Sequence, residues 1–557
     1  AGVGIQRTRE CVQRKTPGGI HVKKMNRFKR RSVFILVLAV VTLPLSCVST
    51  GYEKRAEDRY GTAYLDDMDA FVSGEPAIEK DKQASIPPSG PLQISLNDAI
   101  LSTMENNPSL VVERFNPPIQ HTFTDEEQAV FDPVLDGGIA FERNDVANAG
   151  ITGRGTLDTT TDDYRGSISL KEYFPTGTFM ELGISGSVTD SDQSDDPYAK
   201  ARVGLSVTQS LLRGFGTEVN MARIQQSRIE TAISLYELRG FSETLVAQVE
   251  NAYWDYALAQ RQIEIVEESL KLANQQLVET EEMIRVGAMA EAELAAVQAE
   301  VAAQKQALIN AKSALESNRI LLLRLLNPPG ESFWNRAITI VRPPALPEAE
   351  LGDIEEHVAV AKRMRPEINQ AKLDIQRDEL EVVRTKNGLL PVMDLFINLG
   401  KTGYADSFSG AVDDLPGDNY DVLVGLNFEQ PIRNRSAKAQ RRRSLLKKNQ
   451  AEKILENLSQ LVELEVRNAY IEVNRTREQI TASAATRKFQ EEKVRIETEK
   501  FRVGRSTNLL VAQTQRDLLL NRINEVNTIV DYLKALTSFY RLEGSLLERR
   551  GIVAPGG

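Results

Sequence analysis

Residue types that catalyse reactions or bind metals are sparse in this sequence of 557 residues, and their spacing matches no recognised site. The three histidines, His21, His121 and His357, are far apart and have no cysteine partners, so no metal cluster is indicated. The run GISGS at residues 183–187 has its second glycine one place too early for a nucleophile elbow. The run GFG at 214–216 lacks the third glycine of a phosphate-binding loop. The sequence therefore predicts a protein that is not an enzyme and binds no cofactor.

The chain is acidic, with a formal net charge of −10, so nucleic acid is not an expected partner. One apolar run, VFILVLAVVTLPLSC at residues 33–47, follows a cluster of Lys and Arg residues between 23 and 31. This run is shorter than the roughly 20 residues that a membrane-spanning helix needs. It indicates a secretory signal that begins at Met25, with residues 1–24 lying upstream of it; a retained membrane anchor is the alternative.

Cys47 lies where a lipoprotein signal would be cleaved, directly after Leu45 and Ser46. Pro44 departs from the lipoprotein pattern, which has Leu or a similar residue at that position. Lipidation of Cys47 and ordinary signal cleavage therefore both remain open. The other cysteine, Cys11, falls upstream of the signal, so the mature chain is predicted to hold no disulfide.

An internal repeat organises the rest of the chain. VENAY at residues 249–253 recurs as VRNAY at 466–470, and RVG at 285–287 recurs at 502–504, both at an offset of 217. The offset is 258 near Pro133 and 221 near Gln209, so the first half carries 37 additional residues between these positions. We predict upstream sequence and signal at 1–46, a linker at 47–91, repeats at 92–330 and 353–557, and a connector at 331–352.

Each repeat predicts a leading helix, a strand region and a long helical hairpin, in that order. The leading helices are expected at 96–114 and 354–386, and the hairpins at about 220–326 and 436–546. Each hairpin stretch is almost free of proline and contains a glycine, Gly287 or Gly504, at which it could turn. Residues 220–285 alone would form a helix on the order of 100 Å long, which favours lateral packing of the coiled-coil kind.

Four segments show the period-two alternation of strands that have one apolar face: 135–142, 202–208, 393–399 and 422–428. Their expected lengths of about 9–11 residues suit tilted strands that cross a bilayer. The 37 additional residues contain two more such runs, around Ile168 and Ile184, joined by a tight turn at Pro175-Thr176-Gly177. Because strands in lipid must close into a barrel, several chains must contribute to it.

From Leu92 to its end the sequence resembles the TolC-like outer-membrane efflux family. The resemblance rests on TQSLLRGFG at residues 208–216, on the Val-Gly pairs at 286–287 and 503–504, on Arg365-Pro366-Glu367 and on Leu389-Leu390-Pro391. It implies an α+β membrane protein whose long antiparallel helical hairpins form a periplasmic α-barrel. It also implies transmembrane strands that complete a β-barrel shared by a homotrimer, in the outer-membrane lipid of a Gram-negative bacterium.

The resemblance further implies that a periplasmic adaptor protein and an inner-membrane pump of the RND or ABC type dock at the inner end of the tunnel. The adaptor contacts would be the hairpin tips: Arg285, Val286 and Gly287 in the first hairpin, and Arg502, Val503, Gly504 and Thr507 in the second.

Some members of the family carry acidic residues of a periplasmic gate six and nine positions after the second turn glycine. Those positions are occupied here by Leu510 and Gln513, which makes an acidic gate doubtful. We expect instead a leucine constriction that closes by packing and dewetting.

The expected function is the export of small molecules or polypeptides from a tripartite efflux or type I secretion assembly. The alternative is a trimeric, envelope-spanning coiled-coil protein of structural or adhesin-like type, which strand runs in both halves disfavour. The sequence identifies neither the cargo nor the pump. Six strands per chain would give an eighteen-stranded barrel, whereas the family norm is twelve; the alternative is a hairpin standing outside the cell above a twelve-stranded barrel.

Overall fold

The computed structural model describes residues 90–149, 156–192, 194, 196–329, 333–341 and 351–553. They all belong to one of two units of the chain, Pro76–Gly557. The predicted signal, Cys47, most of the linker 47–91 and half of the connector 331–352 lie outside the described residues.

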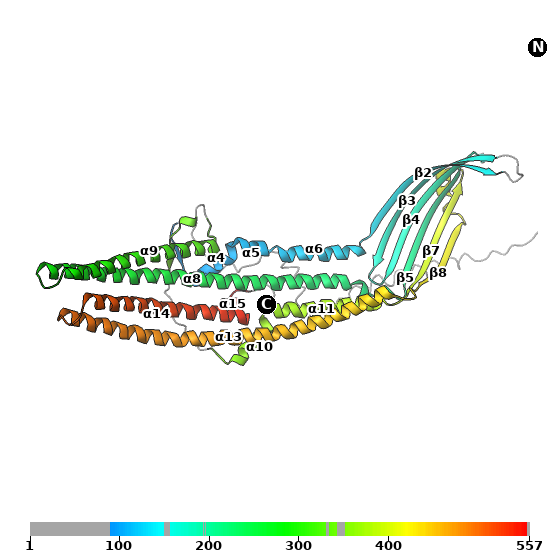
Figure 1. Cartoon of the computed structure of the whole chain (residues 1–557). Coiled ribbons are helices and arrows are strands. Elements are labelled where there is room, and N and C mark those ends of the chain that lie inside the picture. The colour runs from blue at the N-terminus through cyan, green and yellow to red at the C-terminus, as the bar shows by residue number, and fades with distance from the viewer. Residues whose placement is uncertain are drawn as a thin grey trace, which may run out of the picture. The chain divides into compact units, whose positions relative to one another are not determined.

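Helices and strands follow the same order in both halves of the chain (Figure 1). The first half contains β1 (Leu92–Ile94), α4 (Leu96–Asn106), α5 (Pro108–Glu113), α6 (Asn116–Gln128), η3 (Ala129–Phe131), β2 (Val134–Ala149), β3 (Thr156–Phe174), β4 (Thr178–Ser191), β5 (Tyr198–Ser210), α7 (Thr217–Asn220), α8 (Ala222–Arg285), α9 (Ala292–Leu326), η4 (Phe333–Asn335) and β6 (Ile338–Ile340). The second half contains α10 (Ile354–Met364), α11 (Pro366–Asn387), β7 (Val392–Ala405), α12 (Phe408–Asp413), β8 (Tyr420–Glu429), α13 (Arg435–Arg502), α14 (Asn508–Glu543) and α15 (Leu546–Arg549). The short strands β1 and β6 pair in parallel as a separate sheet.

Both leading helices are broken at a proline, so the predicted continuous helices at 96–114 and 354–386 are wrong. A residue that precedes proline is disfavoured in the helical conformation, and Asn107 (φ −68°, ψ 119°) and Arg365 (φ −59°, ψ 129°) are accordingly extended. Asn107 also caps the next helix, because its side-chain oxygen accepts a hydrogen bond from the backbone N–H of Ser109 at 2.9 Å. Helix α6, which leads into β2, was not predicted.

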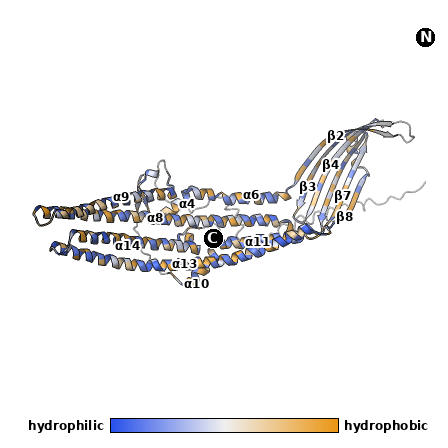
Figure 2. Cartoon of the chain, in the orientation of Figure 1, coloured by the Kyte–Doolittle hydropathy of each residue, from blue (hydrophilic) through white to orange (hydrophobic). Residues whose placement is uncertain are grey.

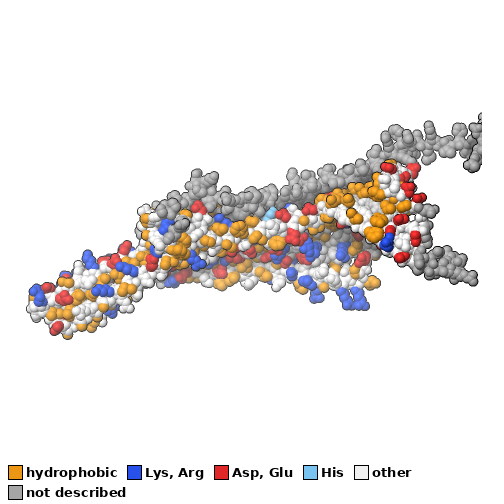
Figure 3. Space-filling view, turned by 90° about the horizontal axis from the view of Figure 1, so that it is seen from above, with side chains coloured by type: hydrophobic (Ala, Val, Ile, Leu, Met, Phe, Trp, Pro, Cys, Tyr) orange, Lys and Arg blue, Asp and Glu red, His pale blue; other side chains and the backbone are white. Residues whose placement is uncertain are grey.

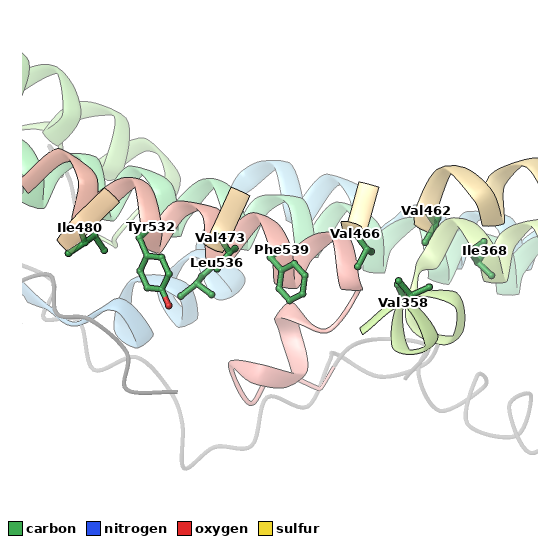
Figure 4. Close-up of a cluster of buried hydrophobic side chains, with 10 residues drawn as sticks. Val358, Ile368, Val462, Val466, Val473, Ile480, Tyr532, Leu536 and Phe539 are labelled. Carbon is green, nitrogen blue, oxygen red and sulfur yellow. The ribbon is translucent and has the colours of Figure 1, made fainter. Parts of the chain in front are cut away.

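The two long hairpins, α8–α9 and α13–α14, lie side by side, with α8 against α14. Val249 and Val466, equivalent positions of the 217-residue repeat, are both fully buried. Polar and apolar residues are interspersed along every long helix (Figure 2), so only a narrow stripe of each is available for packing. One such core joins α10, α11, α13 and α14 (Figure 4); its labelled members are Val358, Ile368, Val462, Val466, Val473, Ile480, Tyr532, Leu536 and Phe539.

Buried ion pairs fasten the C-terminal segment around α15 to α8. Arg239 pairs with Glu548 at 2.6 Å, and Arg550 makes a bidentate pair with the fully buried carboxylate of Glu250 at 2.5 and 2.7 Å. Glu243 lies beside Arg239, and burial raises the pKa of its carboxyl group from 4.5 to about 7. Removing one partner of such a pair leaves a buried charge uncompensated, so the pairs fix the position of the segment around α15 on α8.

The six long strands form one antiparallel sheet in the order β2-β3-β4-β5-β7-β8. They contain between 10 residues, in β8, and 19 residues, in β3. The length of about 9–11 residues predicted for four of them is wrong for β2, β5 and β7 and is confirmed for β8. The additional length has polar residues on both faces, as in Thr159 to Asp163, and such segments give no alternating pattern to detect.

The sheet has one apolar and one polar face, because directly paired residues point to the same side. A continuous aliphatic row crosses all six strands: Leu135, Leu170, Leu182, Leu205, Leu399 and Val422. The neighbouring residues, such as Asp136, Ser169 and Glu181, point to the opposite face. Hydrophobic side chains gather over the strands in the view of Figure 3. The alternation predicted from the sequence is confirmed.

The additional hairpin, β3–β4, is an integral part of this sheet, between β2 and β5. Its turn lies at the helical end: the backbone oxygen of Gly177 accepts from Ser210 N (3.0 Å), and Asn220 Nδ2 donates to the oxygen of Pro175 (2.9 Å). Gly177 has φ +84°, and a Cβ there would lie 2.2 Å from the oxygen of Gly214, so this turn requires glycine. A hairpin projecting from the far end of the sheet is therefore not what this chain forms.

We expect Ile168→Arg to reduce assembly of the protein into the membrane strongly. Ile168 is 61% exposed on the apolar face of β3, and a cation at the middle of a lipid-facing strand costs roughly 2–4 kcal/mol. Ser169→Arg is the matched control, because it places the same cation on the polar face opposite Asp136. Electrophoresis of unheated membranes measures the folded fraction. Equal assembly of both variants would contradict a lipid-facing position of this strand.

We expect the difference in melting temperature between Glu243→Gln and the wild type to shift in favour of the variant as pH rises from about 4.5 to about 8. A carboxyl group whose pKa is raised by folding contributes stability that is fully present below its unfolded pKa of 4.5. That contribution is lost as pH rises through about 7, and the amide of the variant, which does not titrate, would not lose it. Thermal melts at both pH values test this, with the exposed Glu264→Gln as a control; a difference independent of pH would contradict it.

Candidate functional site

The two hairpin tips are built alike. α8 ends in a left-handed turn at Gly287 (φ +74°), with Ala288 N donating to Met283 O at 2.8 Å. α13 ends in the same way at Gly504 (φ +72°), with Arg505 N donating to Lys500 O at 2.8 Å. These bonds define a Schellman motif, which satisfies the last carbonyls of a helix. The predicted turns at the two Val-Gly pairs are confirmed.

The second tip is capped more fully than the first. Thr507 is the N-cap of α14, and its side chain accepts from Leu510 N at 3.3 Å. Ser506 donates to Glu497, which also pairs with Lys500 at 3.1 Å. The N-cap of α9 in the first hairpin makes no side-chain cap bond. The second tip is therefore the more firmly ordered of the two.

Polar contacts tie the second hairpin to the first. Asn508, fully buried at the start of α14, donates to the sulfur of Met289 (3.3 Å) and accepts from Gln276 (3.3 Å). Further along α14, Arg516 pairs at 2.8 Å with Glu300 of α9, whose residue surface is only 5% exposed. A carboxylate so buried depends on its partner far more than a surface ion pair would.

A second tie lies farther from the tips. Arg522 of α14 pairs with Glu268 of α8 at 3.1 Å and with Glu491 of α13 at 3.2 Å. One guanidinium group thus connects the two hairpins through three helices. None of these tying residues was singled out from the sequence, because charged residues are common on every long helix and the Arg516–Glu300 partners are 216 positions apart.

The predicted gate residues lie in the first turns of α14. Leu510 is 42% exposed, and Gln513 is also exposed. Both therefore point away from the core of their own chain. Their mutual approach across copies of the chain, which a gate requires, stays a prediction.

A groove of about 670 Å³ runs between α8, α13 and α14 close to the tips. Its walls combine apolar residues, among them Leu272, Phe501 and Leu518, with charged residues such as Glu282 and Arg502. Of the predicted tip contacts, Arg502 lines this groove. Arg285, at the first tip, pairs with Glu282 at 2.6 Å.

No helix within the described ranges has the length and hydrophobicity needed to span a bilayer. The described residues also contain no group of three or more His, Cys, Asp and Glu side chains placed to hold a metal ion.

A two-faced antiparallel sheet joined to two long helical hairpins is the architecture of outer-membrane channels that continue into a helical tunnel. The family model described as outer membrane efflux protein matches residues 126–328 and 358–545, most of the chain. The chain belongs to this family, and the resemblance seen in its sequence is confirmed.

Solved structures agree with this assignment. The outer-membrane channel OprN superposes with a TM-score of 0.60 at 17% identity, over 84% of this chain and 95% of that one. The Campylobacter jejuni CmeC outer membrane channel gives 0.60 at 16% identity, over 81% and 86%. The open state of the Neisseria gonorrhoeae MtrE outer membrane channel gives 0.57 at 16% identity, over 81% and 89%. At such identities the likeness establishes the fold. No curated protein sequence matches the chain.

We expect Leu510→Ser to raise the single-channel conductance of the purified protein in planar bilayers, because it removes an apolar side chain from the predicted constriction. Leu520→Ser is the matched control: Leu520 is also exposed on α14 but lies about 15 Å farther from the tip. Unchanged conductance of Leu510→Ser would place the gate elsewhere.

Proposed function

We propose that this chain is the protomer of a homotrimeric channel-tunnel that conducts small molecules or polypeptides across the outer membrane of a Gram-negative bacterium. The observation that carries the proposal is the sheet, which is apolar on one face, polar on the other and continuous with two long helical hairpins. A wall with these two faces separates lipid from an aqueous passage.

Several exposed surfaces of the single chain support assembly into a larger unit. Within the described residues, β2 and β8 each pair with one strand only. Large apolar side chains are exposed on the helices as well. On α5 and α6 and in the link between them these are Val112, Phe115, Ile119 and Phe123, and on α13 they are Leu446, Ile454, Leu461 and Leu464. Neighbouring copies that cover these surfaces would bury them between chains, in the wall of a closed tunnel.

The tips are the proposed contact with a periplasmic adaptor and, through it, an inner-membrane pump of the RND or ABC type. The mixed lining of the adjacent groove suits a protein partner better than a small apolar ligand. Leu510 is the residue proposed to close the passage. The contacts of Asn508 and Arg516 would hold the second hairpin against the first. Lipidation of Cys47 remains a proposal about a residue outside the described ranges.

A structural or adhesin-like trimer is the other candidate, and the topology counts against it. Strands of both halves enter one sheet, and each of the two long hairpins follows a strand that belongs to this sheet. This arrangement makes the passage continuous from sheet to helices, which an adhesive stalk would not need.

We expect the purified protein in mild detergent to have the mass of three 62.0 kDa chains, less any cleaved signal, and to give discrete conductance steps in planar bilayers. Unpaired strand edges in lipid are prohibitive for a single chain. Native mass spectrometry measures the number of chains, with the protein denatured in the same detergent as the control. A stable, folded monomer would contradict the proposal.

A further inference from the structure

The two edges of the sheet are complementary. β2 runs away from the helices and β8 runs back toward them. If β8 of one copy lies beside β2 of the next, the two strands are antiparallel, as all the other neighbours in the sheet are. Both edges carry the apolar residues on the same face, so the join continues both faces without interruption.

The backbone groups that would make this join are already aimed at the free edges. Thr402 N of β7 donates to Asn419 O, next to the start of β8 (3.3 Å). The backbone N–H and C=O groups of the even-numbered residues of β8 therefore point away from β7. Leu211 N donates to Met393 O (2.7 Å), so the backbone groups of the odd-numbered residues of β7 point toward β5. β2 runs in the same direction as β7, and in both strands the odd-numbered side chains lie on the apolar face. The backbone groups of the odd-numbered residues of β2 therefore point toward its free edge.

The register of the join follows from the tilt of strands in a barrel. Seen from the apolar face with β2 pointing up, the chirality of the residues places β3 to its left. The fixed twist of sheets makes the strands lean to the right, so a row of paired residues climbs as it passes to the left. Across six strands it climbs by about six residues at a tilt near 35°, or about eight near 43°. We call this climb, counted in residues from β2 of one copy to β2 of the next, the step. An odd step would pair residues of the apolar face of one copy with residues of the polar face of the next.

The step of six residues is the one that the side chains favour. The aliphatic row that starts at Leu135 and ends at Val422 then meets Phe141 of the next copy. The outward pairs along the seam become Phe428–Leu135, Leu426–Gly137, Val424–Ile139, Val422–Phe141 and Tyr420–Arg143. A step of eight would instead set Arg143 against Val422 in the apolar band, which is unfavourable. It would also set Glu429 against Asp136 on the polar face, where one cation, Lys171 at 3.5 Å from Asp136, would face two carboxylates.

On the polar face the step of six sets Asp421 opposite Glu142. Each carboxylate already has a cation of its own chain: Arg202 reaches Asp421 at 2.7 Å, and Arg165 reaches Glu142 at 3.3 Å. The seam therefore brings two ion pairs together, and neither carboxylate is left without a counter-charge.

We propose that three copies join by pairing β8 with β2 of the next copy in this register, closing an eighteen-stranded barrel. The proposal rests on the trimeric channel proposed above. A barrel grows with its strand number, so this one is about half again as wide as a twelve-stranded barrel. The helical tunnel gains nothing, because the additional hairpin turns back at Thr176 and adds no helix. The duct widens where the helices meet the sheet.

A disulfide across the seam tests the register. Ala140 and Leu423 are directly opposed in the step of six, as a non-hydrogen-bonded pair whose Cα atoms lie about 4.5 Å apart, which suits a disulfide. We expect Ala140→Cys with Leu423→Cys to give covalent trimers on oxidation, and the single variants to give none. The matched pair Glu142→Cys with Leu423→Cys is opposed only in the step of eight, and it replaces no glycine. Cross-linking of that pair alone would overturn the register.

Two further measurements separate the possible failures. If neither cysteine pair cross-links while the protein has the mass of three chains, the seam is wrong and the trimeric channel stands; if the mass is that of one chain, the channel proposal itself fails. The strand number is tested with an impermeant thiol reagent on intact cells. Thr176→Cys should stay unlabelled, whereas Ser194→Cys, in the loop at the opposite end of the sheet, should label. Labelling of Thr176→Cys would overturn the eighteen-stranded barrel.

Discussion

A wall in lipid cannot leave backbone hydrogen-bonding groups unpaired, and this constraint governs the rest of the molecule. Each unsatisfied N–H or C=O group in the hydrocarbon region costs several kcal/mol. The six-stranded sheet satisfies its interior and leaves the outer sides of β2 and β8 open within the described residues. The single chain therefore leaves several surfaces that need a cover: the apolar face of the sheet, its two open edges and the exposed apolar residues of α13. These features fit the proposed channel, in which each chain is one segment of a closed ring.

Duplication solves the problem of attaching long helices to such a wall. In each half a strand of the sheet is followed by a long helix: β5 leads through the short helix α7 to α8, and β8 leads to α13. Both hairpins therefore begin at the same sheet. The additional hairpin β3–β4 leaves these connections in place. Its turn is hydrogen-bonded to Asn220 at the junction of sheet and helix. A hairpin added there widens the wall and leaves the helical connections unchanged.

The sequence predicted what periodicity and duplication encode. The shared offset placed Val249 and Val466 in equivalent buried positions and Gly287 and Gly504 in the same left-handed turn. Alternation gave the two faces of the sheet. It could not give the polar ends of β3, which lie outside the alternating part, and no pattern marks the pairing of Arg516 with Glu300, which depends on the packing of two hairpins. Pro108 and Pro366 themselves indicate the breaks in the leading helices, because a residue that precedes proline is disfavoured in the helical conformation.

The distribution of contacts between the hairpins indicates where the helical end can move. Near the tips they meet through amide and charged side chains, of which Asn508 and Arg516 are examples. These groups hold the hairpins together while they are buried, and they bond to water instead when the hairpins separate, which lowers the net cost of separation. Farther along, Ile265 and Val266 of α8 pack with Leu519 of α14 in an apolar cluster that loses its stabilisation when water enters. Separation of the second hairpin from the first is therefore cheapest on the tip side of this cluster. In the proposed channel, opening at this position would change the width of the helical end and leave the wall in the membrane undisturbed.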